Sequence, residues 1–330
     1  MRILSGVQPS GRLHIGNYFG AIHQFVDLQH KGMGLYFIAD LHALTTIRDA
    51  ARMRELVRDV ALNFLALGLD PQKATLFRQS DIPEVAELSW ILSTVTPMGL
   101  LERAHSYKDK TARGISPDHG LFAYPVLMAA DILVYHSDVV PVGRDQKQHV
   151  EITRDIAVKF NSTYCPGFDP ATGEGGALKL PKPLILEETA VVPGIDGQKM
   201  SKSYGNTIDL FGPEKEVRKR IMGIKTDSTP LEAPKDPDKC NVFALIKLFA
   251  QPAELAQIRG LYEKGGTGYG EFKKRLADMF FVRFGEARKR YAELQSDPAY
   301  VEGVLSDGAT RARDIAAKVM QEVRKATGLK

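Results

Sequence analysis

The first eighty or so residues alternate short apolar runs with longer segments of helical periodicity. Strands are predicted at Arg2–Val7, Leu35–Asp40 and Ala74–Gln79, with helices between them at about Ile15–His30 and Ala50–Leu67. Strands joined in this way pair in parallel, and right-handed crossovers place helices on both faces of the sheet. We therefore predict an α/β fold with a Rossmann-type, doubly wound parallel sheet, whose ligands bind at the carboxyl ends of the strands.

The rest of the chain divides into a region of mixed pattern and a region that is helical almost throughout. Helical segments at about 82–135 are interrupted by Pro97, Gly114 and Pro117, and we interpret them as an insertion. We predict a Rossmann-type domain at residues 1–210 and a carboxy-terminal helical domain at residues 211–330. The other elements expected in the first domain are a strand at Val139–Val142, a helix at Asp145–Phe160, a loop at 163–185 and a strand at Glu188–Val192.

The formal net charge of +4 is unevenly divided between these two parts. Residues 1–210 hold 21 Lys+Arg and 23 Asp+Glu, whereas residues 211–330 hold 23 and 17, a net of +6. A basic helical domain is able to hold a polyanion, although a solvated helical surface explains the charge alone more simply.

Cysteine content and hydropathy narrow the class of protein. Cys165 and Cys240 are the only cysteines, too few for a four-cysteine zinc or iron–sulfur site. No apolar run is long enough to cross a bilayer, and Met1–Gln8 lacks the pattern of a signal peptide. We expect a reduced, cytoplasmic protein with no metal site of its own and no membrane partner.

The first candidate ligand site follows the first predicted strand, in the segment Pro9–Asn17. Backbone N–H groups at the start of a helix attract phosphate, and Gly16 lets an adenine ring approach the backbone. His14 and Asn17 are able to donate hydrogen bonds to phosphate oxygens. A purely structural turn between strand and helix explains this pattern equally well.

The second candidate site is a basic loop between glycines, Gly197–Gly205. Lys199 and Lys202, with nearby backbone and hydroxyl donors, suit a triphosphate and are able to stabilise charge on a leaving pyrophosphate. The flanking glycines allow the loop to close over a ligand. Alone, such a loop is more often a solvated surface turn, but after the first motif it favours a nucleotide site.

Together, His14–Asn17 and Lys199–Ser203 resemble the paired signature of the class I aminoacyl-tRNA synthetases. Four further segments, at 5–11, 39–43, 128–133 and 140–149, are similar to bacterial tryptophanyl-tRNA synthetases, and the similarity extends over essentially the whole chain. The resemblance implies a homodimer that forms tryptophanyl-adenylate from L-tryptophan and ATP, with Mg²⁺, and then transfers tryptophan to tRNA(Trp). It also implies that the first domain is catalytic and that the second binds the anticodon.

The resemblance assigns particular residues to ATP. His14, Lys199 and Lys202 are the residues expected to act on the transition state. Lys110 resembles a family lysine that reaches the pyrophosphate, although an exposed lysine at a helix end fits as well. The nucleotide residues that the resemblance implies are Gln8, Pro9, Ser10, Gly16 and Asn17 at the phosphates and adenine, Gly143, Arg144 and Asp145 near the ribose, and Lys199, Met200, Ser201, Lys202 and Ser203 over the triphosphate.

A tryptophan pocket is predicted from helical geometry, because Tyr124, Met128 and Asp131 share one face of a helix. An aspartate on an apolar face needs a partner, and an indole N–H is only a donor, so Asp131 is the predicted reader of the tryptophan ring. The alternative is an aspartate bonded to backbone or to a serine. Further expected pocket residues are Gln146 and Tyr124 at the substrate ammonium, Met128, Val140 and Val142 at the wall, and His42, which resembles a family pocket residue but fits a structural histidine equally well.

Three other functions remain open. A tyrosyl-tRNA synthetase is the nearest, but Leu4 stands where related tyrosine enzymes place a tyrosine, and it cannot bond a hydroxyl. A small-molecule nucleotidylyltransferase does not explain the basic loop, and a non-catalytic RNA-binding paralogue would be expected to lack His14, Lys199 or Lys202. The predicted tRNA contacts, each of which also fits a solvated surface, are Arg218, Lys219, Arg220, Lys273, Lys274 and Arg275.

Overall fold

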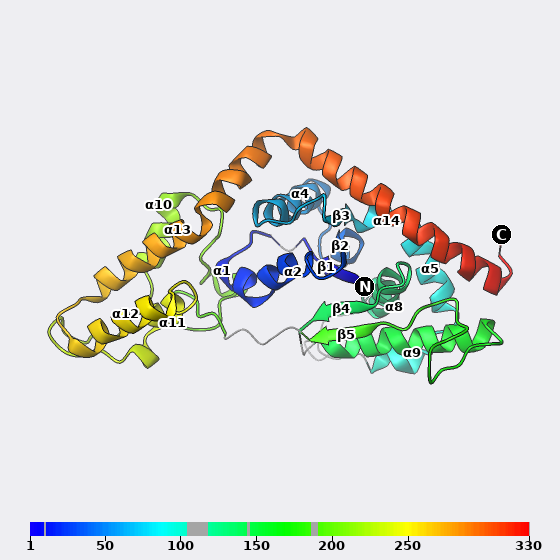
Figure 1. The fold of residues 1–330 in the computed structure, drawn as a ribbon, viewed down its shortest axis with the longest axis horizontal. Coiled ribbons are helices and arrows are strands. Elements are labelled where there is room, and N and C mark those ends of the chain that lie inside the picture. The colour runs from blue at the N-terminus through cyan, green and yellow to red at the C-terminus, as the bar shows by residue number, and fades with distance from the viewer. Residues whose placement is uncertain (10, 104–117, 144–145, 186–190, 330) are drawn as a thin grey trace.

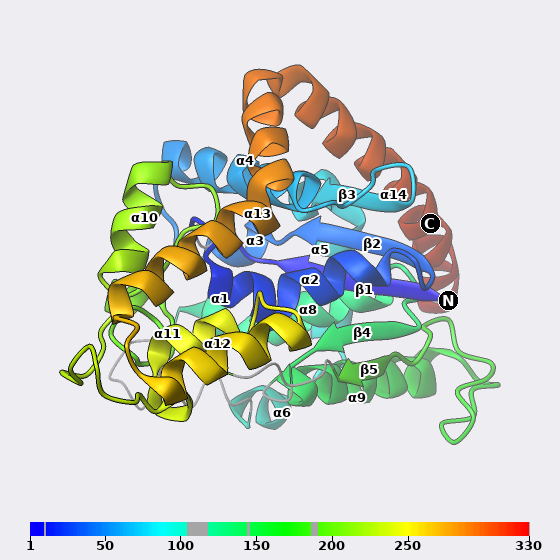
Figure 2. The ribbon, with the colours of Figure 1, turned by 60° about the vertical axis from the view of Figure 1, so that its left-hand side comes forward.

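The computed structural model describes residues 1–9, 11–103, 118–143, 146–185 and 191–329. Its centre is a sheet of five parallel strands in the order β3-β2-β1-β4-β5 (Figure 2). The predicted α/β fold with a doubly wound parallel sheet is therefore confirmed. The strands are β1 (Arg2–Val7), β2 (Met33–Ile38), β3 (Ala74–Arg78), β4 (Val139–Val142) and β5 (Lys182–Ile185).

The order of the strands determines where a ligand is able to bind. The chain moves outward from β1 through β2 to β3, and then returns to the other side of β1 to form β4. Where the strand order reverses in this way, the connections leave a crevice at the carboxyl ends of the two central strands. In this protein that crevice lies between the loops that begin at Gln8 and at Gly143.

The prediction of a loop at 163–185 is wrong at both ends of this range. Helix α9 (Lys147–Tyr164) continues into its first residues, and its last residues form the edge strand β5. Proline has no N–H to donate to a neighbouring strand, so Pro181 and Pro183 argue against a strand in the sequence. An edge strand such as β5 nevertheless tolerates them. Of the strand predicted at Glu188–Val192, only Val191 and Val192 are described, and they belong to no strand.

One face of the sheet is covered by the helices that follow β1 and β2. The predicted helix after β1 is built from α1 (Ile15–Asn17), the π-helical η1 (Tyr18–Ile22) and α2 (His23–Leu28). Helix α4 (Ala50–Ala66) begins where the Asp49 side chain accepts a hydrogen bond from the Arg52 N–H, which caps its first turn. These helices bury the side chains of β2 and β3 that face them, including Tyr36, Ile38 and Leu76.

The opposite face packs against the segment that was predicted as a helical insertion. Its described parts form α5 (Pro83–Ser93), α6 (Met98–Glu102) and α8 (His119–Leu133), and α9 lies beside α8. Residues of alternate parity on the strands point into this second core, among them Leu4, Leu35, Phe37 and Phe77. This alternation follows from the two-residue period of a strand.

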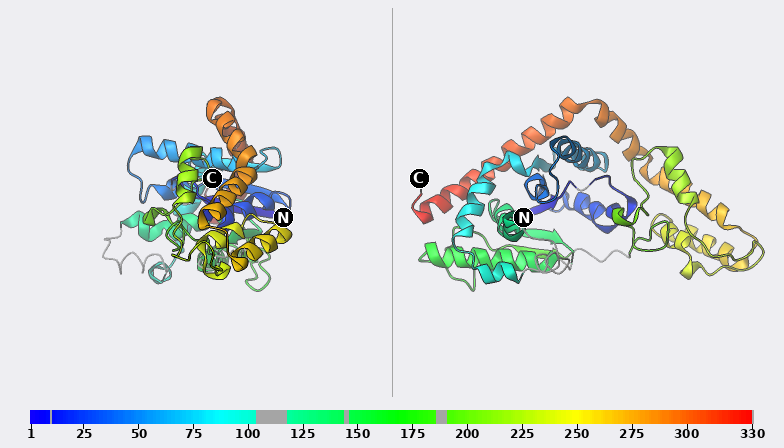
Figure 3. Two further views of the ribbon diagram at one scale, coloured as in Figure 1. Left: turned by 90° about the vertical axis from the view of Figure 1, so that its left-hand side faces the viewer. Right: turned by 180° about the vertical axis from the view of Figure 1, so that it is seen from behind.

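After residue 211 the described chain is mainly helical, as predicted, although 223–236 form a non-helical stretch that was not expected. Figure 1 shows α13 and α14 as the two sides of a roof, and the view from behind in Figure 3 shows the same arrangement, with α11 and α12 beside the outer part of α13. No helix of the described part is both long and apolar enough to cross a membrane. The helices are α10 (Glu214–Met222), α11 (Asn241–Ile246), α12 (Pro252–Lys264), α13 (Tyr269–Ser296) and α14 (Pro298–Thr327).

Helix α14 returns to the sheet and lies along the edge strand β3. At Gly308 the approach is so close that a Cβ atom would lie 1.9 Å from the carbonyl oxygen of Leu76, so only glycine fits there. Beyond this point Ala312, Ala316 and Val323 enter the second core. The division of the chain near residue 210 remains a prediction.

Candidate functional site

The two motifs predicted to bind a nucleotide lie side by side. Ile15 N–H donates to the carbonyl of Ile208 at 3.0 Å, and Leu210 N–H donates to the carbonyl of Leu13 at 3.1 Å. The strand-like segment that follows the basic loop therefore runs antiparallel to the first motif. Lys202 Nζ also donates to the carbonyl of Gly11 at 2.9 Å.

His14 lies at the centre of this contact, with only 4% of its surface exposed. Burial, and then the charge of Lys202, lower the pKa of the His14 imidazole from 6.5 to about 4. Its Nδ1 has no hydrogen-bond partner among the described residues. The ring is therefore neutral at pH 7 and is able to donate or accept a hydrogen bond without carrying a charge.

Packing explains the glycine of the first motif. A Cβ atom on Gly16 would lie 2.9 Å from Nδ1 of His14 and 3.2 Å from Cβ of Met200. Asn17 uses its amide oxygen to accept a hydrogen bond from the His14 N–H at 3.2 Å, which leaves its amide nitrogen for the predicted phosphate contact. Met200, from the second motif, is 5% exposed, so it packs against the first motif and not into solvent.

The basic loop is held at its base by Asn206, which sequence reasoning did not single out. Its amide nitrogen donates to Asp196 Oδ1 at 2.8 Å and to the Lys199 carbonyl at 3.2 Å, and its amide oxygen accepts from the Ser201 N–H at 2.8 Å. Asn206 is 2% exposed, so these bonds are shielded from water. They fix the backbone on both sides of Met200.

Both lysines of the loop are exposed, but only Lys202 is held by a contact with the first motif among the described residues. Lys202 begins the short 3₁₀ segment η4 (Lys202–Tyr204), and partial desolvation lowers the pKa of its ammonium. Ser201 Oγ lies 2.8 Å from Ser203 Oγ, and Lys199 is exposed. The structure thus brings His14, Met200 and Lys202 together, with Lys199 nearby in the chain.

Several predicted nucleotide residues lie in or next to the parts of the chain that are not described. Gln8 and Pro9 directly follow β1, and Gly143 directly follows β4, as expected for the crevice. Gln146 is the first described residue after Gly143. Ser10, Lys110, Arg144 and Asp145 fall outside the described residues, and their roles remain predictions.

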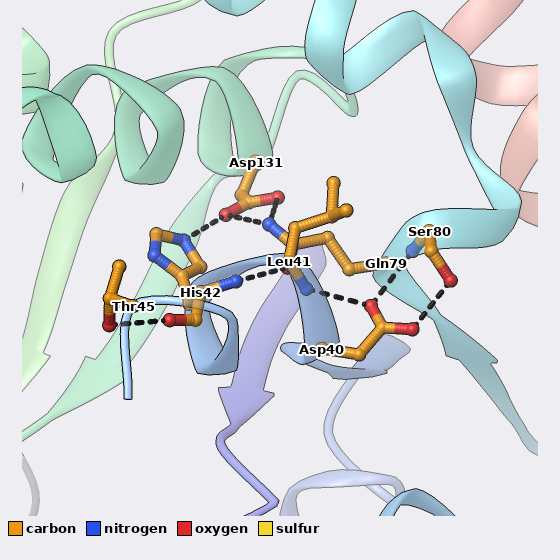
Figure 4. A network of polar contacts seen from close by, with 7 residues as sticks. All are labelled: Asp40, Leu41, His42, Thr45, Gln79, Ser80 and Asp131. Carbon is orange, nitrogen blue, oxygen red and sulfur yellow. Dashed lines mark hydrogen bonds and ion pairs between the residues drawn. The ribbon is translucent and has the colours of Figure 1, made fainter. Parts of the chain in front are cut away.

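Asp131 lies at the centre of a buried polar network, on the face of the sheet that α5 and α8 cover (Figure 4). It is 1% exposed, and its Oδ2 lies 2.8 Å from His42 Nε2. Gln79 Nε2 lies 2.8 Å from Oδ1 and 2.9 Å from Oδ2. Burial raises the pKa of Asp131, while the hydrogen bonds from His42 and Gln79 act in the opposite direction. Among the described residues, its partners are thus a histidine and a glutamine, and not backbone or a serine.

Other predicted pocket residues lie in or against the core on this face of the sheet. Tyr124 and Met128, both partly buried, lie on α8 with Asp131, and Val140 and Val142 are buried on β4. The Tyr124 hydroxyl lies 2.7 Å from His149 Nε2, and its ring contacts that of His42 edge-on at 6.2 Å between centroids. Leu4 is 1% exposed and belongs to the same core, so β1 offers no hydroxyl partner there.

Gln79, like Asn206 at the basic loop, is a residue that the sequence did not reveal. The strand prediction did end at Gln79, and polar residues at the carboxyl ends of parallel strands are the usual ligand residues of such sheets. That position was the available signal. Its partner Asp131 is 52 residues away in the sequence, so no local pattern connects the two.

The residues predicted to hold tRNA are partly engaged within the protein. Arg218 contacts Glu214 at 2.8 Å and Asp278 at 3.0 Å, both on exposed surface. Lys273 Nζ donates to the Met222 carbonyl, and Lys274 lies 3.8 Å from Glu271. Exposed ion pairs of this kind contribute little stability, so they do not prevent contact with a polyanion.

Comparison with known proteins gives a consistent result. The family of tRNA synthetases class I (W and Y) matches residues 1–285. The tryptophan–tRNA ligase of Rhodopirellula baltica is 54% identical over 330 residues, with all of both chains covered. The crystal structure of tryptophanyl-tRNA synthetase from Campylobacter jejuni, complexed with ADP and tryptophan, is 52% identical and superposes with a TM-score of 0.93 over both whole chains.

More distant solved structures share the same architecture. Tryptophanyl-tRNA synthetase from Mycoplasma pneumoniae is 29% identical, with a TM-score of 0.78 over all of this chain and 98% of that one. Tyrosyl-tRNA synthetase from Archaeoglobus fulgidus, at 22% identity and a TM-score of 0.60, shares the fold over 88% of this chain and 90% of that one. The matched family model and the full-length relatives agree with the paired motifs and the strand order, and the chain belongs to the class I tRNA synthetases of the tryptophan and tyrosine family.

Proposed function

We propose that this protein activates L-tryptophan with ATP and then esterifies it to tRNA(Trp), the reaction of a tryptophan–tRNA ligase. The observation that carries this proposal is the contact of the first motif with the basic loop, which joins Gly11 to Lys202 across 191 residues of sequence. Relatives that match the whole chain at 52–54% identity are tryptophan–tRNA ligases.

In the first step, the carboxylate of tryptophan attacks the α-phosphate of ATP, and the bond to the β-phosphate oxygen breaks as pyrophosphate leaves. The neutral ring of His14 offers a hydrogen bond where phosphate charge develops. Lys202 and Lys199 bring positive charge to the triphosphate, and the Asn206 bonds keep their loop in place. In the second step, a ribose hydroxyl at the tRNA terminus attacks the carbonyl carbon of the adenylate, and the bond to the phosphate oxygen breaks as AMP leaves.

Magnesium accompanies ATP in this proposal, bound by phosphate oxygens and water. The imidazole of His14 and the ammonium groups of the two lysines suit phosphate and not a hard cation, and the carboxylate of Asp209 acts on both His14 and Lys202. Within the described residues, no group of three His, Cys, Asp or Glu side chains is placed to hold a metal ion. When bound with the nucleotide, the ion would supply charge neutralisation at the phosphates.

Asp131 selects the amino acid, because its carboxylate accepts the indole N–H, which a phenol ring does not offer at that position. The apolar side chain of Leu4 favours tryptophan over tyrosine for the same pocket. Tyr124 and Gln146 bind the ammonium group, and Met128, Val140 and Val142 form the wall.

The protein acts as a homodimer in the cytoplasm, with the helical domain at 211–330 at the anticodon. Support for a second subunit comes from Trp90 on α5 and Met98 on α6, which are 74% and 64% exposed. Large apolar side chains that stay exposed on two consecutive helices are the kind of surface that an interface covers.

Amino-acid-dependent ATP–pyrophosphate exchange tests the activity and the role of Asp131 together. We expect tryptophan, and not tyrosine, to support exchange, and Asp131→Ala to raise the KM for tryptophan by about 100-fold or more, because a charged acceptor is lost. Exchange with tyrosine alone would contradict the assignment of tryptophan as the substrate. Full activity of the variant would contradict the role of Asp131. Absence of exchange with any amino acid would favour an RNA-binding paralogue.

A further inference from the structure

The side chain of Gln79 connects three separate parts of the structure (Figure 4). Gln79 begins the short 3₁₀ segment η2 (Gln79–Asp81) at the carboxyl end of β3 and is 1% exposed. Its amide oxygen accepts hydrogen bonds from the N–H groups of Leu41 at 3.1 Å and His42 at 3.3 Å, in helix α3 (Asp40–Ala43). Its amide nitrogen donates to both carboxylate oxygens of Asp131 on α8.

These contacts leave only one orientation for the Gln79 amide. If the group were turned over, its NH₂ would face two backbone N–H donors and its oxygen would face a carboxylate. Both contacts would be repulsive. The donors of α3 therefore determine that N–H groups, and not oxygen, point at Asp131.

The partners that Asp131 has in the described part of the chain leave it with the capacity for one more donor. A carboxylate has about four lone-pair positions, and three are occupied by the two contacts of Gln79 Nε2 and by His42 Nε2. We propose that Gln79 is a positioning residue for tryptophan selection, which holds the Asp131 carboxylate as an oriented acceptor for the indole N–H. This inference rests on the proposed function of Asp131.

A role in packing alone does not explain this arrangement. Gln79, Asp131 and His42 are all at most 7% exposed, and burying such groups costs as much as their bonds return. An apolar trio of the same volume would hold β3, α3 and α8 together at least as well. Arg78 and Ser80 also hold the segment without Gln79, because Arg78 binds Glu302 and Asp81, and Ser80 N–H donates to Asp40.

The first test compares tryptophan with its benzothiophene analogue, in which sulfur replaces the ring N–H. In Gln79→Met the donors are removed and the side-chain length is kept. We expect the KM for tryptophan in ATP–pyrophosphate exchange to rise about 10- to 100-fold, with kcat within a few-fold of wild type. The KM for the analogue should change less than about 3-fold, because it offers no N–H to Asp131. An equal rise for both substrates would show a packing role and overturn the inference.

A second variant, Gln79→Glu, keeps an oxygen for the two α3 N–H groups and removes only the donor to Asp131. Two adjacent buried carboxyl groups share one proton, so one pKa of the pair is strongly raised. Below that pKa the shared proton replaces the lost donor, and preference for tryptophan over the analogue should return as pH falls. The other ionisable groups that act on this site are His42 and Asp40 of α3, Tyr135 after α8 and Glu84 of α5. Wild type should show no such pH dependence, and a flat profile in Gln79→Glu would contradict the inference.

Asp131→Ala, measured in the same assay, separates this inference from the proposed function. If Asp131→Ala abolishes the preference for tryptophan over the analogue and Gln79→Met does not, then the positioning role is wrong and the role of Asp131 stands. If the preference survives in Asp131→Ala, both assignments are wrong.

Discussion

At the scale of single residues, His14 is the most unusual group near the nucleotide site. It is a polar ring in a buried position, beside a lysine, and its Nδ1 has no partner among the described residues. Such a group destabilises the folded state whenever it is protonated. The buried imidazole therefore lowers the free energy of unfolding by an amount that depends on pH.

The sign of this cost follows from the lowered pKa of His14. Between pH 6.5 and about 4 the unfolded chain binds a proton that the folded protein does not, so the free energy of unfolding falls as the pH falls through this range. The contribution reaches roughly 3 kcal/mol at most, since one pKa unit corresponds to about 1.4 kcal/mol. Urea unfolding at pH 7 and pH 4.5 should show a smaller loss of stability for His14→Gln than for wild type. His119→Gln, at an exposed histidine, is the matched control. Equal losses in wild type and His14→Gln would contradict this account.

Sequence reasoning identified ionisable residues in recognisable motifs or on an apolar helix face. It missed the amide residues that hold those groups in place. His14 and Lys202 were predicted from their motifs, and the structure places them together. Asp131 was predicted to need a partner because it lies on an apolar helix face. Gln79 and Asn206 were missed because an amide has no chemistry that marks it, and their roles depend on contacts made only in the folded chain.

At the scale of elements, prediction succeeded where one local signal dominates. The limits of β1 and β4 agree with the apolar runs, and α4 begins at its predicted residue and ends one residue early. β5 was missed because two prolines hid it. The periodicity of α14 shows that one side is apolar, but it carries no information on which part of the protein that side contacts.

Glycine substitutions within α14 test its packing on β3. Gly308→Ala should lower the free energy of unfolding by about 1–3 kcal/mol, because the new methyl group would overlap the Leu76 carbonyl oxygen. Gly303→Ala, in the same helix with no atom within 4 Å of its Cβ position, should instead stabilise by up to about 1 kcal/mol. Thermal or urea unfolding of the two variants measures the difference. Equal effects would show that α14 does not approach β3 as closely as described.

At the scale of the whole molecule, the proposed dimer depends on an exposed apolar surface at α5 and α6. Trp90→Glu should shift the protein towards the monomer in analytical ultracentrifugation, because a charge would then be buried in the interface. Val282→Glu is the control, since Val282 on α13 is also exposed, at 85%, and lies outside this surface. An unchanged dimer in Trp90→Glu would place the interface elsewhere.

The return of α14 to the sheet also has a consequence during synthesis. Pro298, where α14 begins, follows the last residue of β3, Arg78, by 220 positions (298 minus 78). A growing chain therefore exposes the free edge of β3 long after the strands beside it have left the ribosome, and such an edge is prone to pair with other chains. Contacts between residues so distant in sequence also form slowly. The nascent protein thus passes through a long interval in which most of its sheet is made but the edge at β3 has no cover, and in that interval this edge is open to pairing with other chains.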